Sequence, residues 1–302
     1  MVKRILDATA TDFLKMNATD LAKSIQMTEG RTISAEVICT YEPPTEGVTL
    51  AEIAAAFGAD IITLDYFDPD NPLIMGLPPE IAQKGDVLFQ LKRLVGRPIA
   101  VNMAITKQSE GGWLYTRRYT PERLDKLVRQ GADILFLYGD PQSGVTLDEM
   151  VSTIQHISSN YYERLLLVAI PDVYFPAPVS DKIKSVYKQA HEKLLSAGAH
   201  SIGLIMPGSK QAWRLEETGV LVDHVHALGG LVWLIMTHSV EGGPTDNIHQ
   251  IALNAKMVGG DAYRLDEAGL YGMPLPENIF EFSLAIRGKR HTYRRMALSP
   301  LR

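Results

Sequence analysis

Eight short apolar segments, spaced roughly 30 residues apart, constrain what this chain can fold into. Each segment is rich in Ile, Val and Leu, is nearly continuous in hydrophobicity, and ends in polar residues. Continuous hydrophobicity of this kind is typical of parallel strands that are covered on both faces by helices. The segments begin at Thr32, Ala59, Arg97, Ala132, Leu165, His200, Leu231 and Asp261.

The stretches between these segments are amphipathic and carry helix start signals. Capping-box patterns begin at Thr49 and Thr146, and Thr120 stands before a proline at the first helical position. Strict alternation of strands and helices over 302 residues predicts one domain, a closed (β/α)8 barrel spanning residues 1–302. A doubly wound open sheet is the alternative, but no G-x-G-x-x-G follows the first strand.

Two segments lie outside the eight repeats. Residues 1–30 form a helical extension, in which a helix over residues 8–28 is expected to close the bottom of the barrel. The last helix starts near Pro276 and runs into a basic tail, residues 287–302. We expect this tail to be a solvated helix end or a subunit contact, and the alternative is an acidic or nucleic-acid partner.

Composition narrows the possible partners and the cellular location. The net charge of -5 argues against nucleic-acid binding in general. A single cysteine, Cys39, fits a reducing compartment, and no signal peptide or apolar run of roughly 18 residues is present. We therefore expect a cytoplasmic protein that binds a small-molecule substrate, without a membrane or nucleic-acid partner, and that can form a homo-oligomer.

In barrels of this type the active site lies at the carboxyl ends of the strands. Alternation along the first strand turns Glu36 toward the interior, and alternation along the eighth turns Arg264 and Asp266 to one face. Isolated buried charges are costly, and the first and eighth strands are neighbours in a closed barrel. The sequence therefore predicts an Arg264–Glu36 ion pair, which either is structural or presents Arg264 to an anionic substrate.

Four aspartates follow four different strands and are expected to converge on the mouth of the barrel. Asp65, Asp140 and Asp266 are candidate ligands for a divalent metal such as Mg²⁺. Asp172 and Asp65 are candidates for acid–base catalysis. The alternative for each aspartate is that it caps a neighbouring helix. The sequence carries no signature of a nucleotide cofactor.

His238 ends the seventh strand and is the best-placed histidine for a general acid or base, because its ordinary pKa lies near 6.5. A packed, hydrogen-bonded histidine is the alternative. The long connection 106–119 carries two glycines that could act as a hinge and an arginine that could hold a carboxylate or phosphate. The candidate substrate-binding residues are Glu36, Asn102, Arg117, Tyr138, Gly242, Gly243 and Arg264.

The stretches Ser239–Gly243 and Leu265–Gly269 resemble the glycine-rich loops of the phosphate-binding group of (β/α)8 (TIM) barrels. This resemblance implies a phosphate site after strands seven and eight, formed with a helix N-terminus. The sequence departs from that pattern at Glu241, Asp266 and Glu267, which place negative charge where a phosphate would sit. No more specific family is indicated.

Together these features predict an enzyme that acts on a small polar metabolite, expected to be anionic through a carboxylate or phosphate. The expected reaction is that of an aldolase-type lyase or an isomerase, with His238 or Asp172 as the base. A hydrolase that activates water on a bound metal is one alternative. A barrel that binds a metabolite or a protein without catalysis is another.

Overall fold

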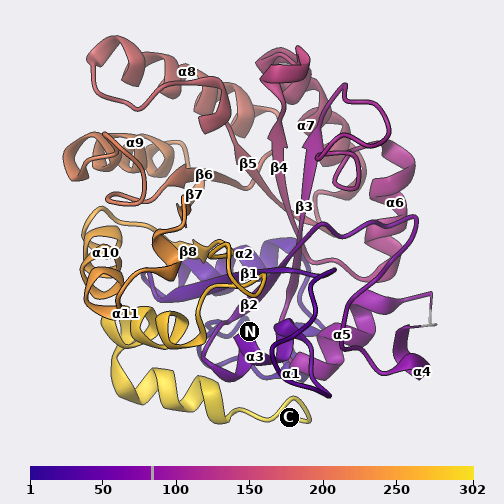
Figure 1. Ribbon diagram of the computed structural model, residues 1–302. Coiled ribbons are helices and arrows are strands. Elements are labelled where there is room, and N and C mark those ends of the chain that lie inside the picture. The colour runs from indigo at the N-terminus through magenta and orange to yellow at the C-terminus, as the bar shows by residue number, and fades with distance from the viewer. Residues whose placement is uncertain (83–84) are drawn as a thin grey trace.

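The computed structural model describes residues 1–82 and 85–302 and contains a closed barrel of eight parallel strands (Figure 1). The strands follow one another around the barrel in chain order, and β8 pairs with β1 to close it. All eight predicted segments are strands, so the prediction of a (β/α)8 barrel is confirmed. The strands are β1 (Thr32–Ile38), β2 (Ile61–Asp65), β3 (Ile99–Ile105), β4 (Ile134–Gly139), β5 (Leu166–Ile170), β6 (Ser201–Ile205), β7 (Leu231–Met236) and β8 (Ala262–Leu265).

Helices surround the strands (Figure 1), and their start signals act as predicted. The side chains of Thr49, Thr120 and Thr146 each accept a hydrogen bond from a backbone amide in the first turn. Within the described residues, no helix combines the length and apolarity that crossing a membrane requires. The α-helices are α1 (Ala10–Phe13), α2 (Ala18–Gln26), α3 (Leu50–Ala56), α4 (Pro79–Ala82), α5 (Val87–Val95), α6 (Pro121–Gln130), α7 (Leu147–Tyr161), α8 (Asp181–Ser196), α9 (Leu215–Ala227), α10 (Thr245–Met257) and α11 (Pro276–Ala297), and the short 3₁₀ turns are η1 (Pro141–Ser143), η2 (Asp172–Tyr174) and η3 (Val240–Gly242).

Side chains alternate along the strands between two apolar cores. In β1, Ile33, Ala35 and Val37 belong to the core between the strands and the helices, as the sequence pattern predicts. The interior of the barrel holds the second core, in which Phe136 meets Trp233 edge to face with ring centroids 5.0 Å apart. The interior is therefore a packed core, and a ligand can be bound only at its ends.

The N-terminal extension closes the end of the barrel where the strands begin. Residues 8–28 form two helices instead of the single helix expected, because Asn17 caps α2 by accepting a hydrogen bond from the amide of Asp20 at 2.8 Å. Phe13, Leu21 and Ile25 pack into the interior core. The predicted closure of the bottom is confirmed, and the opposite end remains for a functional site.

The basic tail, residues 287–302, is not the solvated helix end that the sequence predicts. Arg287 and Arg295 are buried, and both pair with the buried carboxylate of Asp60 at N···O distances of 2.5 and 2.8 Å. The chain turns at Gly288, whose φ of 70° suits glycine, and so returns Arg295 toward the barrel. The backbone amide of Thr11 donates to the carbonyl of Arg302, which places the C-terminal residue beside the N-terminal extension.

We predict that replacing Asp60 destabilises the whole barrel. The substitution Asp60→Asn leaves two buried guanidinium groups without a counter-charge, and this should lower the free energy of unfolding by about 3 kcal/mol or more. Asp7→Asn is the matched control, because Asp7 pairs with Arg294 at the exposed surface and should cost less than about 1 kcal/mol. Denaturant unfolding measures both, and equal small losses would contradict a structural role for the tail.

Candidate active site

A cavity of about 660 Å³ lies at the carboxyl ends of the strands, where the sequence predicts the site. Its wall combines carboxylates, one arginine and aromatic side chains from β1 and β2 and from the loops that follow β1, β2, β3, β7 and β8. Its size suits a small metabolite. The lining residues are Glu36, Ile38, Thr40, Tyr41, Asp65, Tyr66, Trp113, Arg117, Thr237, His238, Ser239, Asp266 and Glu267.

The predicted ion pair between β8 and β1 is present beneath this cavity. The Nη2 atom of Arg264 lies 3.3 Å from Oε2 of Glu36, and its Nε donates to Asp266 Oδ1 at 2.7 Å. The guanidinium also lies over the ring of Phe136, 4.6 Å from its centroid. Arg264 is therefore held between two carboxylates and the top of the interior core.

Asn102 on β3 links this pair to a second one. Its amide Nδ2 donates to Glu36 Oε2 at 2.7 Å and to Asp65 Oδ1 at 3.1 Å, and its Oδ1 accepts from Arg264 Nη1 at 3.1 Å. Asp65 in turn accepts from Nη1 of Arg117 with both carboxylate oxygens, at 2.9 and 2.8 Å. One connected network therefore spans β1, β2, β3, β8 and the loop after β3.

The loop of residues 106–119 brings Arg117 to the cavity. Its end returns to β3, where Ala104 N donates to Arg117 O at 2.8 Å and Tyr119 N donates to Ala104 O at 2.7 Å. The guanidinium of Arg117 lies 4.1 Å from the ring centroid of Tyr66 and 5.0 Å from that of Trp113. Arg117 is thus fixed by Asp65 and two aromatic rings, a partnership that the sequence pattern does not indicate.

Burial changes the protonation of the carboxyl groups at this end. It raises the pKa of Glu36 well above its ordinary value, and the nearby carboxylates Asp266 and Asp65 add to the effect, whereas Arg264 opposes it. Burial likewise raises the pKa of Asp266 against the attraction of Arg264. Glu36 and Asp266 therefore hold a proton more tightly than they would in water.

Asp172 lies directly after β5, in the turn η2. Burial raises its pKa to about 6, although the charges of Lys210 and Arg264 act in the opposite direction. Its Oδ1 atom is buried and has no hydrogen-bond partner among the described residues. A carboxyl group with a pKa of about 6 is suited to proton transfer, although Asp172 lies outside the lining of the cavity.

Several residues that the sequence predicts for the site do not belong to the central hydrogen-bonded network. His238 is exposed on the cavity rim, where its backbone adopts a left-handed conformation with φ of 66°. Tyr138 packs against the interior core, and burial raises its pKa. The amides of Gly242 and Gly243 donate to Ser239 O and Val240 O inside the turn η3, so they are not directed at a phosphate.

Of the three aspartates predicted as metal ligands, Asp65 and Asp266 line the same cavity, whereas Asp140 does not. Asp140 caps the turn η1 and accepts from Thr106 Oγ1 at 2.7 Å and Gln108 Nε2 at 3.0 Å, the capping alternative recognised from the sequence. Asp65 and Asp266 face arginines instead. Across residues 1–82 and 85–302, no three His, Cys, Asp or Glu side chains are spaced to hold a metal ion.

Glu241 has an environment that the sequence did not predict. Its side chain is fully buried in η3, and neither carboxyl oxygen has a hydrogen-bond partner in the described part of the chain. Burial raises its pKa to about 8, and the charges of Asp266 and Glu267 also raise it. Asn278 on α11 fixes this turn by donating to Glu241 O at 2.6 Å and Gly243 O at 2.8 Å.

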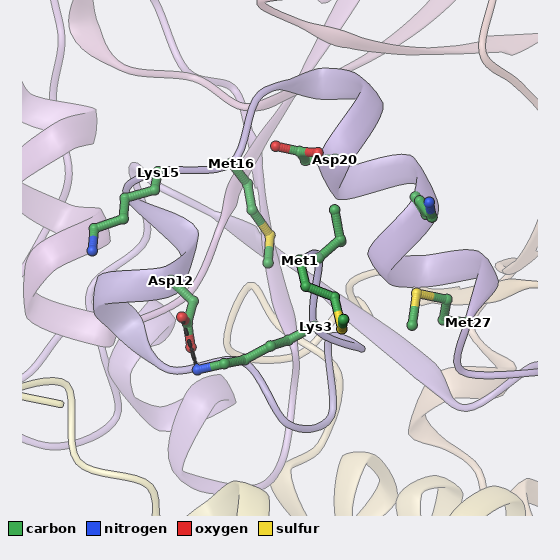
Figure 2. Close-up of a pocket in the computed structure, with 9 residues that line it drawn as sticks. Met1, Lys3, Asp12, Lys15, Met16, Asp20 and Met27 are labelled. Carbon is green, nitrogen blue, oxygen red and sulfur yellow. Dashed lines mark hydrogen bonds and ion pairs between the residues drawn. The ribbon is translucent and has the colours of Figure 1, made fainter.

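A second cavity, of about 640 Å³, lies beside the N-terminal helices at the other end of the barrel (Figure 2). Lys3 and Asp12 on its wall form an ion pair at 2.8 Å, and Met1, Met16 and Met27 supply its apolar surface. It lacks the connected buried charges of the first cavity. The carboxyl ends of the strands therefore remain the better candidate site.

The match to a family model decides the family. The chain belongs to the family described as "Domain of unknown function (DUF7916)", whose model matches residues 6–302. None of the curated proteins matches the chain in sequence. The family match covers the barrel and its C-terminal tail.

Solved structures that resemble this protein are also barrels. An archaeal fructose 1,6-bisphosphate aldolase is 11% identical with a TM-score of 0.55, and the alignment covers 89% of this chain and 99% of the aldolase. The carboxyl transferase domain from Rhizobium etli pyruvate carboxylase with pyruvate is 12% identical with a TM-score of 0.56, covering 98% of this chain and 53% of that one. At such identities the likeness shows the fold alone.

We predict a specific pH dependence of stability from Asp172. Because its pKa is raised to about 6, the folded protein holds this proton more tightly than the unfolded chain, and the resulting stabilisation is lost as pH rises from about 4 to 6. Asp172→Asn should therefore become more stable relative to the wild type over that range, by at most about 3 kcal/mol.

Denaturant unfolding from pH 4 to pH 7 measures this difference. Asp181→Asn is the control, because it removes the same carboxyl group from a fully exposed position on α8. A flat difference for Asp172→Asn would refute the raised pKa.

Proposed function

We propose that this protein is an enzyme that moves a proton on a small polar metabolite at the carboxyl ends of its strands. The reaction class is that of an aldolase-type lyase or an isomerase, in which a proton is removed next to a carbonyl group. The observation that carries this proposal is Asp172, a carboxyl group with a pKa of about 6 and an unused oxygen, placed near the fixed cation Arg264.

Asp172 suits the role of general base. A base is most effective when its pKa lies near the working pH, because it is then both ionised and able to accept a proton. At pH 7 a group with a pKa of about 6 is mostly ionised. The negative charge that develops on the carbonyl oxygen would be stabilised by the guanidinium group of Arg117, which lines the cavity. His238, on the rim, is the second candidate for proton transfer.

Arg117 is the residue that we expect to bind the anionic group of the substrate. Its Nη1 binds Asp65, and its Nε and Nη2 make no hydrogen bond within the described part of the chain. Because Arg117 lines the cavity, Nη2 is the donor available to a carboxylate or phosphate. Arg264, by contrast, is already held by Glu36, Asn102 and Asp266, so its role is to fix the network.

The proposal can be tested by exchange of substrate hydrogen for deuterium. Small 2-oxo acids and hydroxyketones are incubated with the protein in D₂O, and loss of the proton signal next to the carbonyl is followed by NMR. We expect exchange that increases as pH rises through about 6, as Asp172 ionises. Asp172→Asn should slow it about 100-fold or more, and Asp181→Asn should leave it unchanged.

Exchange that survives in the double variant Asp172→Asn, His238→Gln at the wild-type rate would defeat the assignment of the base. Absence of exchange with every compound tested, together with binding of these compounds to the cavity, would instead favour a barrel that binds a metabolite without catalysis.

A further inference from the structure

The wall of the active-site cavity holds more carboxyl groups than cationic groups. Among the described residues, four carboxylates line it, and Arg117 is the only arginine or lysine in that lining. Arg264 lies beneath the wall and adds one more positive charge to the network. An uncompensated excess of buried carboxylates is costly, so such a wall favours a ligand that brings positive charge. The four carboxylates are Glu36, Asp65, Asp266 and Glu267.

These carboxylates differ in how much of their hydrogen-bonding capacity the protein uses. Asp65 is fully engaged, since both its oxygens accept from Arg117 and one also accepts from Asn102. Glu36 is nine-tenths buried, and its Oε2 accepts from Asn102 and faces Arg264. No hydrogen bond to its Oε1 is formed by the described residues, although the side chain lines the cavity.

Glu267 and Asp266 complete the acidic side of the cavity. Glu267 uses one oxygen, Oε2, to accept from the amide of Gly269 at 2.7 Å. Asp266 accepts from Arg264 Nε at 2.7 Å through Oδ1. Because both follow β8, and β8 pairs with β1, they lie next to Glu36 on the same side of the cavity.

We propose that the molecule bound in this cavity carries an ammonium group that lies against Glu36, Asp266 and Glu267. The inference rests on the proposed function, because it names the substrate class of that same site. With an anionic group at Arg117, the substrate is a small amino acid or a similar zwitterion. The ammonium group donates to Glu36 Oε1 and balances the excess of negative charge.

A metal ion is a poorer match for the same wall. The described residues contain no three His, Cys, Asp or Glu side chains at metal-binding spacing. A carboxylate or phosphate on the acidic side is repelled by Asp266 and Glu267, and the one arginine that could attract it there is already bound by carboxylates. An ammonium group needs only acceptors and tolerates irregular spacing.

The test uses four compounds with the same flexible four-carbon chain and different ends. They are 4-aminobutyrate, 4-amino-1-butanol, 4-hydroxybutyrate and 1,4-butanediol, so that the amine and the carboxylate are each present or replaced by a hydroxyl group. Binding to the full-length protein is measured by NMR titration. We expect each amine to bind about tenfold or more tightly than its hydroxyl counterpart.

Variants locate the effect in the cavity. Glu267→Gln should weaken binding of both amines about threefold or more and leave the diol unaffected. Glu36→Gln should weaken binding of the amines further. Because this variant also alters the buried ion pair between Glu36 and Arg264, Glu267→Gln is the decisive variant. Glu216→Gln, an exposed position on α9 that removes the same charge, should change nothing.

The inference is overturned if neither amine binds better than its hydroxyl counterpart, or if Glu216→Gln weakens the amines as much as Glu267→Gln. The comparison of 4-aminobutyrate with 4-amino-1-butanol tests the anionic end separately. Amine binding without deuterium exchange on any carbonyl compound would therefore support this inference while defeating the proposed reaction.

Discussion

The ion pair between Glu36 on β1 and Arg264 on β8 is the interaction on which this mouth of the barrel depends. Arg264 emerges from the last strand into the barrel interior, where a guanidinium without a partner would be costly. Glu36, Asn102 and Asp266 surround it, and Asn102 passes the connection on to Asp65. Because these groups come from four strands, the closed barrel itself brings them together, and their network fixes the floor of the cavity.

Much of this arrangement follows from sequence. Eight apolar segments predict eight strands, and a period of two along β1 and β8 turns Glu36 and Arg264 inward, so the ion pair could be inferred before the structure. The carboxyl ends of parallel strands meet at one edge, which places the acidic residues at one mouth. The capping role of Asp140 was also a recognised alternative, since an aspartate after a strand often caps the following turn.

Other features depend on contacts that no local pattern specifies. Arg117 reaches Asp65 because the end of its loop forms backbone hydrogen bonds with β3. The glycines and aromatic residues of the loop do not predict this pairing. The basic composition of the tail predicts that Arg295 is solvated. In the structure Arg295 is buried and pairs with Asp60, which lies more than two hundred residues earlier in the chain. Glu241 resembles a loop residue in sequence, but Asn278 on α11 holds its turn against the barrel and leaves the carboxyl group buried. In each case the deciding partner is distant in the chain.

A double-mutant cycle tests the central claim most directly, using Glu36→Gln, Arg264→Met and the variant with both changes. The free energy of unfolding of each is measured in denaturant at pH 7. If the buried pair organises this mouth, each single change leaves one group unpaired and the two changes are strongly non-additive, with a coupling of about 2 kcal/mol or more. A coupling below about 0.5 kcal/mol would show that the two residues act independently and would contradict the account.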